Sequence, residues 1–317
     1  MKQEIAIVWL KRDLRLIDHE PLYFAQKQNL PVLLIYCFEP SVMNYDDSDV
    51  RHWRFVYQSL MDMQEKLAAL QTQVYIFHNE ALTVFQHLDE YYTIKKLFSH
   101  QEIGNKITFD RDISVQDFCT KKGIEWKEYQ HNGVVRRLKS RINWEERWKQ
   151  KMNDSPKWVD KQNWKSCVLE EGVYKSIKGP DLPQEITSEN KNFQPGGESN
   201  AWKYLNSFLN ERYVNYSKFI SKPHLSRRGC SRISPYLSYG NISMRMVYQS
   251  TMKHYEQATN KRALSNFISR LFWHCHFMQK FEDECTMEFE NCNKAYDDLV
   301  KPKNEAFIEA WQTGKTG

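Results

Sequence analysis

The chain has 317 residues, enough for about two domains of ~150 residues each. Hydrophobic residues make up 41% and charged residues 27%, which excludes a disordered or collagen-like chain. The net charge of +5 hides a basic middle, because residues 134–232 carry 20 Lys and Arg side chains against 11 Asp and Glu. Such a region indicates either an anionic partner or a solvated Lys-rich surface.

The first 130 residues alternate short apolar runs with helical patterns. We predict strands at residues 5–10, 31–38, 73–78, 95–100 and 124–129. We predict helices at residues 19–28, 51–70, 81–91 and 112–122. Apolar strands separated by helices predict a doubly wound, parallel five-stranded sheet with helices on both faces, whose ligands bind beyond the carboxyl ends of the strands. We assign this α/β domain to residues 1–133.

Glycine is absent from the start of this domain, and the first one is Gly104. A glycine-rich loop that cradles a pyrophosphate or triphosphate is therefore not expected here. This argues against an ordinary NAD-dependent dehydrogenase and against a P-loop enzyme.

The remaining chain divides into a predicted linker, residues 134–200, and a helical domain, residues 201–317. The linker ends in a strong breaker, Pro195-Gly196-Gly197. After it, helical patterns fill residues 201–219, 234–257, 261–281 and 303–312. The predicted fold class is α/β followed by all-α.

The cysteines and the N-terminal sequence together indicate in which cellular compartment we expect the protein. The seven cysteines are scattered and odd in number, and the apolar run at residues 5–10 is too short for a signal peptide. No apolar stretch reaches the ~18 residues of a membrane span. We expect reduced thiols and a cytoplasmic protein.

Two segments carry polar groups at the ends of predicted elements. Arg12 and Asp13 follow the first strand and are interpreted as an ion pair that orders its exit. Residues 230–245 are dense in hydroxyls, with Ser234 and Pro235 at the positions of an N-cap and a first helical residue. This second segment is either a capped helix or a phosphate site.

A third segment, residues 270–277, lies in a predicted helix. Arg270, Trp273, His274 and Phe277 fall at i, i+3, i+4 and i+7, which places them on one face. Such a face suits a planar ligand or a base. Consecutive helical residues point ~100° apart, so the run from His274 to His276 does not share one ion. An iron–sulfur cluster needs four thiolates, more than this region offers, and we predict no metal site.

Four sequence motifs together resemble the photolyase/cryptochrome family. The run VWLKRDLRLIDHEPL (8–22) is similar to its opening signature, and CSRISPYLSYGNISMR (230–245) to its flavin-phosphate segment. RLFWHCHF (270–277) falls where the family has a helix with a substrate-facing Trp. WQTGKTG (311–317) resembles the start of its Trp-x-x-Gly-x-Thr-Gly motif.

The resemblance implies FAD in the helical domain and an antenna chromophore, of folate or deazaflavin type, on the α/β domain. In photolyases the light-excited reduced flavin donates an electron to a pyrimidine dimer that is flipped out of DNA. The residues implied to contact FAD are Tyr216, Cys230, Ser231, Arg232, Ile233, Ser234 and His274. Those implied to act on the lesion are Trp273 and Arg270, and those implied to contact DNA are Lys222, Arg227, Arg228, Trp273 and Phe277.

The chain also departs from the family pattern. Arg270 stands where photolyases have an acidic residue, His274 and Cys275 replace a basic–acidic pair, and Cys230 replaces a Thr. We therefore keep two hypotheses: a photolyase-like carbon–carbon lyase that acts on damaged DNA, and a cryptochrome-like blue-light photoreceptor. A flavin-free α/β nucleotide-binding protein is disfavoured by the hydroxyl-rich segment.

Family members continue beyond the motif in which Gly317 lies. The resemblance therefore implies that residues 201–317 are only the front part of the helical domain. On this basis we expect the 317-residue chain to bind FAD weakly or not at all and to be inactive alone. We also expect a monomer without a membrane partner.

Overall fold

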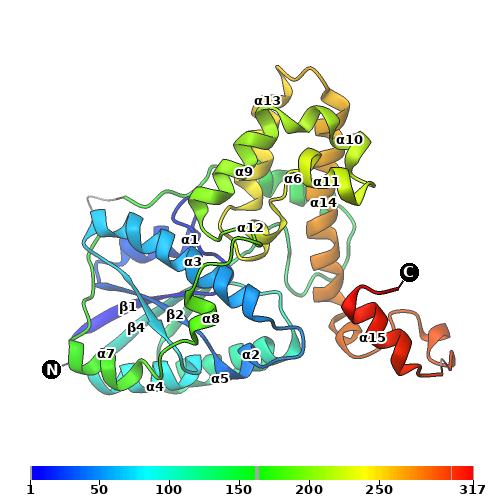
Figure 1. Cartoon of the computed structure of the whole chain (residues 1–317). Coiled ribbons are helices and arrows are strands. Elements are labelled where there is room, and N and C mark those ends of the chain that lie inside the picture. The colour runs from blue at the N-terminus through cyan, green and yellow to red at the C-terminus, as the bar shows by residue number, and fades with distance from the viewer. Residues whose placement is uncertain (1, 161–163, 301, 317) are drawn as a thin grey trace.

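Five parallel strands form the sheet at the centre of the N-terminal half (Figure 1). The computed structural model describes residues 2–160, 164–300 and 302–316. The strand order is β3-β2-β1-β4-β5. The strands are β1 (Glu4–Leu10), β2 (Val32–Cys37), β3 (Val74–Phe77), β4 (Thr93–His100) and β5 (Glu125–Tyr129). All five predicted strands and the doubly wound fold are confirmed.

Helices cover both faces of the sheet. In β1, Ile5, Ile7 and Trp9 pack on one side, and Ala6 and Val8 pack on the other. A strand buried on both faces reads as a continuous apolar run, which is why the sequence located it. The helices on the first side are α4 (Ala81–Tyr91), α5 (Lys106–Lys122) and α7 (Glu171–Ile177). Those on the second are α1 (Glu20–Ala25) and α3 (Val50–Leu67).

Two details of this half differ from the prediction. Helix α5 begins at Lys106 rather than at Asp112, because its first turn does not show the apolar period: Phe109 is exposed, whereas the polar Thr108 is buried. The short helix α2 (Pro40–Met43) buries none of its residues, so no hydrophobic pattern marked it. Single 3-10 turns follow α1 and α3, at Gln26–Gln28 and Ala68–Leu70.

The segment predicted to be a linker packs against both halves of the molecule. It contains α6 (Trp144–Asn153), α7 and α8 (Gln184–Thr187). Trp144 and Trp148 are buried in the core of the helical half, whereas Val173 and Ile177 are buried in the core beside the sheet. The domain boundaries at residues 133 and 200 stay predictions.

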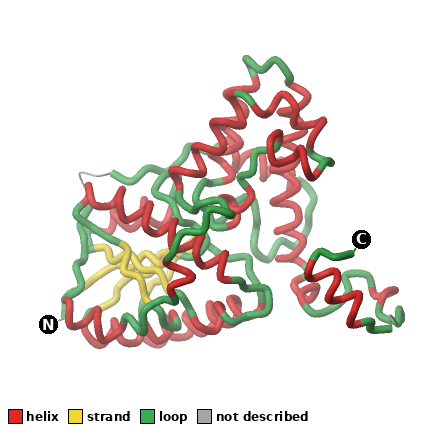
Figure 2. Tube along the Cα trace, viewed as in Figure 1, coloured by secondary structure: helices red, strands yellow, loops and turns green. Residues whose placement is uncertain are grey.

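The described residues after 200 contain no strand, as Figure 2 shows. Their helices are α9 (Glu198–Asn210), α10 (Tyr216–Phe219), α11 (Pro223–Gly229), α12 (Ser234–Ser238), α13 (Met244–Tyr255), α14 (Lys261–Asp283) and α15 (Glu305–Thr313). The 3-10 turns are Arg212–Asn215, Cys285–Glu288 and Lys294–Tyr296. Phe208, Tyr216 and Phe267 form an aromatic core between α9, α10 and α14. Helix α15 lies apart from this core (Figure 1).

All seven cysteines are free, as predicted. Among the helices of the described ranges, none is both long and apolar enough to cross a membrane.

The loop after β1 is joined to the loop between α12 and α13 by buried hydrogen bonds. Arg15 donates to the carbonyl oxygen of Gly240 at 2.9 Å, and Asn241 donates to the carbonyl oxygen of Leu14 at 2.9 Å. The Ser243 hydroxyl donates to the Asp18 carboxylate at 2.6 Å. We call residues 14–18 with residues 239–243 the interlock.

The interlock requires glycine at position 240. Gly240 has a φ of +65°, and a Cβ placed there would lie 2.1 Å from the carbonyl oxygen of Arg12. Because that neighbour is backbone, it cannot move aside as a flexible side chain would.

We predict that Gly240→Ala destabilises the fold far more than Gly123→Ala. Gly123 also has a positive φ, +68°, but a Cβ there meets nothing within 4 Å. The Gly123 change should cost only the left-handed strain of about 1–2 kcal/mol, whereas Gly240→Ala adds a clash with backbone. Urea unfolding measures both, and equal losses in the two variants would contradict the close approach.

Candidate functional site

A cavity of about 330 Å³ opens beside the segment that precedes α12. It brings together residues that the sequence predicted to contact FAD with one that it predicted to contact DNA. The lining residues are Gln194, Tyr216, Ser226, Arg227, Cys230, Ser231, Arg232, Ile233 and Ser234. We call this the loop cavity.

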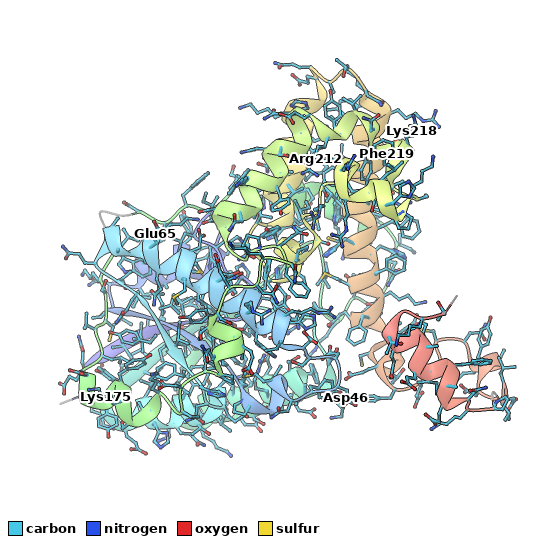
Figure 3. All side chains as sticks on the ribbon, viewed as in Figure 1. Asp46, Glu65, Lys175, Arg212, Lys218 and Phe219 are labelled. Atoms are coloured by element: carbon cyan, nitrogen blue, oxygen red, sulfur yellow. The ribbon has the colours of Figure 1, made fainter. Side chains whose placement is uncertain are left out.

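Two side chains hold the carbonyl groups of the loop. Arg212 donates to the carbonyl oxygens of Cys230 and Ser231, the second at 3.3 Å. Gln194 donates to the carbonyl oxygen of Arg232 at 2.9 Å. Neither residue was identified from the sequence, because no motif marks a side chain whose role is to bind main-chain oxygens. Figure 3 labels Arg212 among the helices of this region.

The amide groups of the same loop have no acceptor among the residues that the structure describes. Within the described ranges, no hydrogen bond is made by the backbone N–H of Ser231, Arg232, Ile233 or Ser234. Arg232 has a φ of +59°, and Ile233 has a φ of −90° with a ψ of −2°. A left-handed residue beside a right-handed one turns successive N–H groups toward a common concavity that binds anions.

The helix predicted to begin at Ser234 is confirmed but short. Helix α12 has five residues, and its N-cap is Ile233, so the Ser234 hydroxyl does not cap it as expected. The dipole of one turn is small, since the effect grows with aligned peptide units. The free amides, hydroxyls and arginines are therefore the groups that the cavity offers to an anion.

The charges around the loop cavity are positive. Arg232 lies 5.7 Å from the centre of the Tyr204 ring. Among the described side chains, no carboxylate lies within 4.0 Å of the guanidinium of Arg227 or Arg232. Burial, followed by the like charge of Arg232, lowers the pKa of Arg212. Burial raises the pKa of the Tyr216 hydroxyl to about 12, so it is neutral and can donate a hydrogen bond.

Helix α14 presents an aromatic face beside this region. The Trp273 ring is 5.0 Å from His276 and 5.7 Å from Phe277, measured between centroids. Trp273 is 43% exposed and Phe277 62% exposed. Arg270 is exposed. Its positive charge acts to lower the pKa of the Tyr216 hydroxyl, against the larger effect of burial, so Arg270 lies on the side of helix α14 that is nearer the loop cavity. We call Trp273, His276 and Phe277 the aromatic face.

His274 takes a different place from its predicted neighbours. It is partly buried, its Nδ1 atom has no hydrogen-bond partner among the described residues, and burial lowers its pKa. It does not line the loop cavity. His276 packs on Trp273 instead, since residues three apart on a helix are neighbours.

The predicted DNA-contacting cations lie on α11 and at its start. Lys222 is the N-cap of α11, and Arg227 and Arg228 are in its last turn. All three side chains are exposed. Arg227 alone of these also lines the loop cavity. Lys218, labelled in Figure 3, adds a further cation at the outer edge of this region.

Asp13 does not pair with Arg12, so that expectation was wrong. Its carboxylate oxygen lies 2.7 Å from His100 Nδ1 and 3.1 Å from His19 Nε2. Arg12 instead pairs with Glu102 at 3.2 Å. Adjacent residues leaving a strand point in different directions, which separates the two side chains.

Asp13, His19 and His100 are close enough to hold a metal ion. However, His19 Nδ1 accepts a hydrogen bond from the Leu22 amide at 3.2 Å. A histidine that binds a metal normally donates its second ring nitrogen to an acceptor. We therefore interpret the group as a buried hydrogen-bonding cluster. Burial alone would raise the pKa of Asp13, but its contacts with His19 and His100 lower it well below its usual range.

The carboxyl ends of the strands, where a ligand was expected, are occupied by ion pairs. Arg111 contacts Glu39, Glu102 and Asp112 at 2.7, 2.6 and 2.8 Å. The hollow that remains is about 40 Å³. A wider cleft of about 430 Å³ lies next to it, between the sheet half and α12, and is lined in part by Trp53 and Tyr239.

Comparison with known proteins finds that the chain is similar to one protein family. Residues 6–140 match the model of the DNA photolyase family. The chain is 22% identical to a cryptochrome DASH of Synechocystis over 98% of its length and 67% of the relative. It is also 22% identical to a (6-4) DNA photolyase of Arabidopsis thaliana, over 98% of this chain and 61% of that one.

A solved structure shows the same fold. The crystal structure of a cryptochrome from Synechocystis superposes on this chain with a TM-score of 0.81 at 20% sequence identity. The superposition covers 100% of this chain and 69% of the cryptochrome chain. The chain spans roughly half to two thirds of the length of the curated relatives it matches.

We predict that two buried histidines, His100 and His131, whose ring centroids lie 5.5 Å apart, make the fold sensitive to acid. Burial lowers the pKa of His100 to about 3, and burial and then the charge of His100 lower that of His131 well below 6.5. The unfolded chain restores values near ~6.5. It then binds more protons than the folded chain as the pH falls from ~6.5 toward ~3, so stability is lost in that window.

Unfolding free energies across this range test the two histidines. Each buried histidine should contribute a slope of up to about 1.4 kcal/mol per pH unit. His131→Gln should flatten the slope, whereas the exposed His224→Gln should not. An unchanged slope in His131→Gln would show that this histidine does not carry the effect.

Proposed function

We propose that this chain, whose residues 6–140 match the model of the DNA photolyase family, serves light-driven, FAD-dependent repair of pyrimidine dimers in DNA. The loop cavity would hold the phosphates of FAD, and the aromatic face would contact the lesion. The observation that carries this proposal is the row of amides at residues 231–234, which bond to no residue of the described ranges. They lie next to Arg227 and Arg232, which have no carboxylate partner among the described side chains.

The residues of the loop cavity fit a diphosphate. Anions bind where backbone N–H groups converge and where cations are not already paired. Arg232 and Arg227 supply charge, and Ser231 and Ser234 supply hydroxyls. Arg212 keeps the loop carbonyls occupied, so that they do not face the anion. The neutral Tyr216 hydroxyl can donate a further hydrogen bond.

The chemistry of repair would come from the flavin. Reduced FAD, held by the residues of the loop cavity, would on excitation supply the electron for splitting the dimer and take it back afterwards. The chain's own residues bind and orient. Trp273 offers a flat face for an extruded base, and Lys222 and Arg228 offer charge to DNA phosphates.

One observation favours the second candidate, a cryptochrome-like photoreceptor without repair. Arg270 is exposed near the loop cavity, at the position where the family resemblance places an acidic residue. A cation there cannot accept a hydrogen bond from a base or release a proton as a carboxylic acid does.

An antenna of folate or deazaflavin type is proposed only for the wider cleft. The hollow at the strand ends is too small for a ring system, and ion pairs cross it. The cleft beside it has room, and the rings of Trp53 and Tyr239 offer stacking surfaces.

We predict that Arg232→Ala weakens FAD binding about tenfold or more, because hydrogen bonds to charged groups are worth ~1.5–3 kcal/mol. Calorimetric titration with FAD measures even the weak affinity that we expect for this chain. The matched control is Arg228→Ala, which removes a nearby arginine, in the last turn of α11, that does not line the cavity. Equal weakening in both variants would mean that general charge, not the loop, attracts FAD.

We also predict separable effects on DNA. Trp273→Ala should reduce the preference for dimer-containing over undamaged DNA, by the ~1–3 kcal/mol of a base stacked on an aromatic ring. Lys222→Ala should weaken binding to both DNAs alike and reduce the salt dependence. Fluorescence anisotropy with labelled oligonucleotides measures these affinities, and Trp311→Ala, an exposed Trp on α15, is the control.

Blue light on dimer-containing DNA, with reduced flavin present, decides between the two candidates. Loss of dimers supports repair. Because we expect the 317-residue chain alone to be inactive, the test uses the full-length protein loaded with flavin. DNA binding that does not depend on dimers, with no loss of dimers by that protein, supports the photoreceptor.

A further inference from the structure

A short loop before helix α6 presents an isoleucine to solvent. Ile142 is 76% exposed, although isoleucine is among the residue types most often buried. It belongs to residues 135–143, which contain four Lys and Arg side chains and no Asp or Glu, and which we call the basic loop. Single exposed apolar residues are common on protein surfaces. What sets Ile142 apart is how its loop is held and what lies beside it.

The basic loop is fixed to helix α14 at both of its ends. At its start, the buried Gln279 side chain accepts from the Val135 amide at 2.8 Å and donates to the Val135 carbonyl oxygen at 3.0 Å. Just after its end, the Trp144 indole donates to the same Gln279 side chain at 3.1 Å. Between these points, the Arg141 guanidinium pairs with a carboxylate of α14 at 2.8 Å. A loop held in this way is ordered before a partner binds, which lowers the entropic cost of binding.

The basic loop lies on one flank of α14 and the loop cavity on the other. Trp144, which follows the loop, packs on Phe272 and His276 at 5.1 and 6.1 Å between ring centroids, and α6 lies beside α14 in Figure 1. On the opposite flank, Phe267 packs on Tyr216 of the loop cavity at 5.7 Å. At 3.6 residues per turn, the two exposed rings of the aromatic face point between these flanks. The aromatic face therefore separates the loop cavity from the basic loop.

The charges of the basic loop suit a partner rich in phosphates. Arg136 and Arg141 are paired with carboxylates of β5 and α14. Lys139 is exposed, and none of the described side chains offers a carboxylate oxygen within 4.0 Å of its ammonium group. DNA places phosphates around an apolar stack of bases. An apolar side chain next to an unpaired cation matches both parts of that surface.

We propose that Ile142 inserts into the base stack of damaged duplex DNA and fills the space that the extruded dimer leaves. The inference rests on the proposed function, because it needs a lesion that leaves the duplex toward the aromatic face. Apolar side chains such as Ile, Leu and Met act as wedges between base steps in proteins that kink DNA. Extruding a base costs stacking and pairing energy, and a side chain in the gap offsets part of that cost. Ile142 would thus determine specificity for the duplex.

Fluorescence anisotropy with two dimer-containing DNAs, a duplex and a single strand of the same sequence, tests the wedge. Only the duplex has a gap to fill. We expect Ile142→Ser to weaken binding of the duplex about tenfold and binding of the single strand less than about twofold. Ile142→Met keeps an apolar wedge and should retain most of the duplex affinity. Ile113→Ser, at an exposed isoleucine of α5, is the matched control and should change neither affinity.

A 2-aminopurine opposite the dimer reports the insertion itself, because its fluorescence rises when it is unstacked. Without a wedge the neighbouring bases close on the gap and restack. At saturating protein, which removes differences in affinity, the rise should be smaller with Ile142→Ser than with the unchanged chain or with Ile113→Ser.

Two kinds of failure are distinguishable. The wedge is overturned if Ile142→Ser weakens binding of the duplex and the single strand equally, weakens neither, or gives the full rise in 2-aminopurine fluorescence. A preference for dimers that still depends on Trp273 would then leave the proposed function standing and assign the basic loop to a protein partner. Equal affinity of the unchanged chain for dimer-containing and undamaged duplexes would instead overturn the proposed function, and this inference with it.

Discussion

The buried charge of Asp18 holds the two halves of the molecule together. Burial alone would raise its pKa, but Arg15, the Ser243 hydroxyl and Arg245 lower it, so the carboxylate remains charged within the interlock. A buried charge is tolerated only when its partners are in place. The loop after β1 therefore cannot shift without leaving a charge uncompensated, and the short stretch of chain from residue 234 to residue 243 carries this constraint to the loop cavity.

The sequence predicted the sheet well because buried parallel strands leave a strong local signal. The apolar runs of β1 and β2 are confirmed almost to the residue. The segment from residue 134 to residue 200 was harder to interpret, because Trp144 and Trp148 bury themselves against helices that come much later in the chain. A contact over such a separation leaves no period within a local window.

The candidate site was likewise predicted only where the signal lies within a short stretch of sequence. Hydroxyls and a Ser-Pro pair located residues 230–234, and the structure gathers most of them at one cavity. The sequence did not predict that the backbone N–H groups of this loop are left free. The free amides depend on the left-handed turn at Arg232 and on Arg212 and Gln194, which hold the carbonyls from elsewhere in the fold. Likewise, the helical period grouped His274 with Trp273, whereas side-chain packing selects His276.

The interlock also limits how the sequence of such a chain can change during evolution. The run from Lys11 to His19, which resembles a family signature, is bonded to residues 239–243 through Leu14, Arg15 and Asp18, and its Asp13 and His19 contact each other. A recombined chain would take its first half from one relative and its second half from another. The residues that bond to each other across the interlock would then come from different proteins and would not match. Substitutions at Asp18 and Ser243, or at Arg15 and the turn at Gly240, should consequently have been accepted in pairs during descent. The two motifs would then evolve as a single unit, although more than 200 residues separate them.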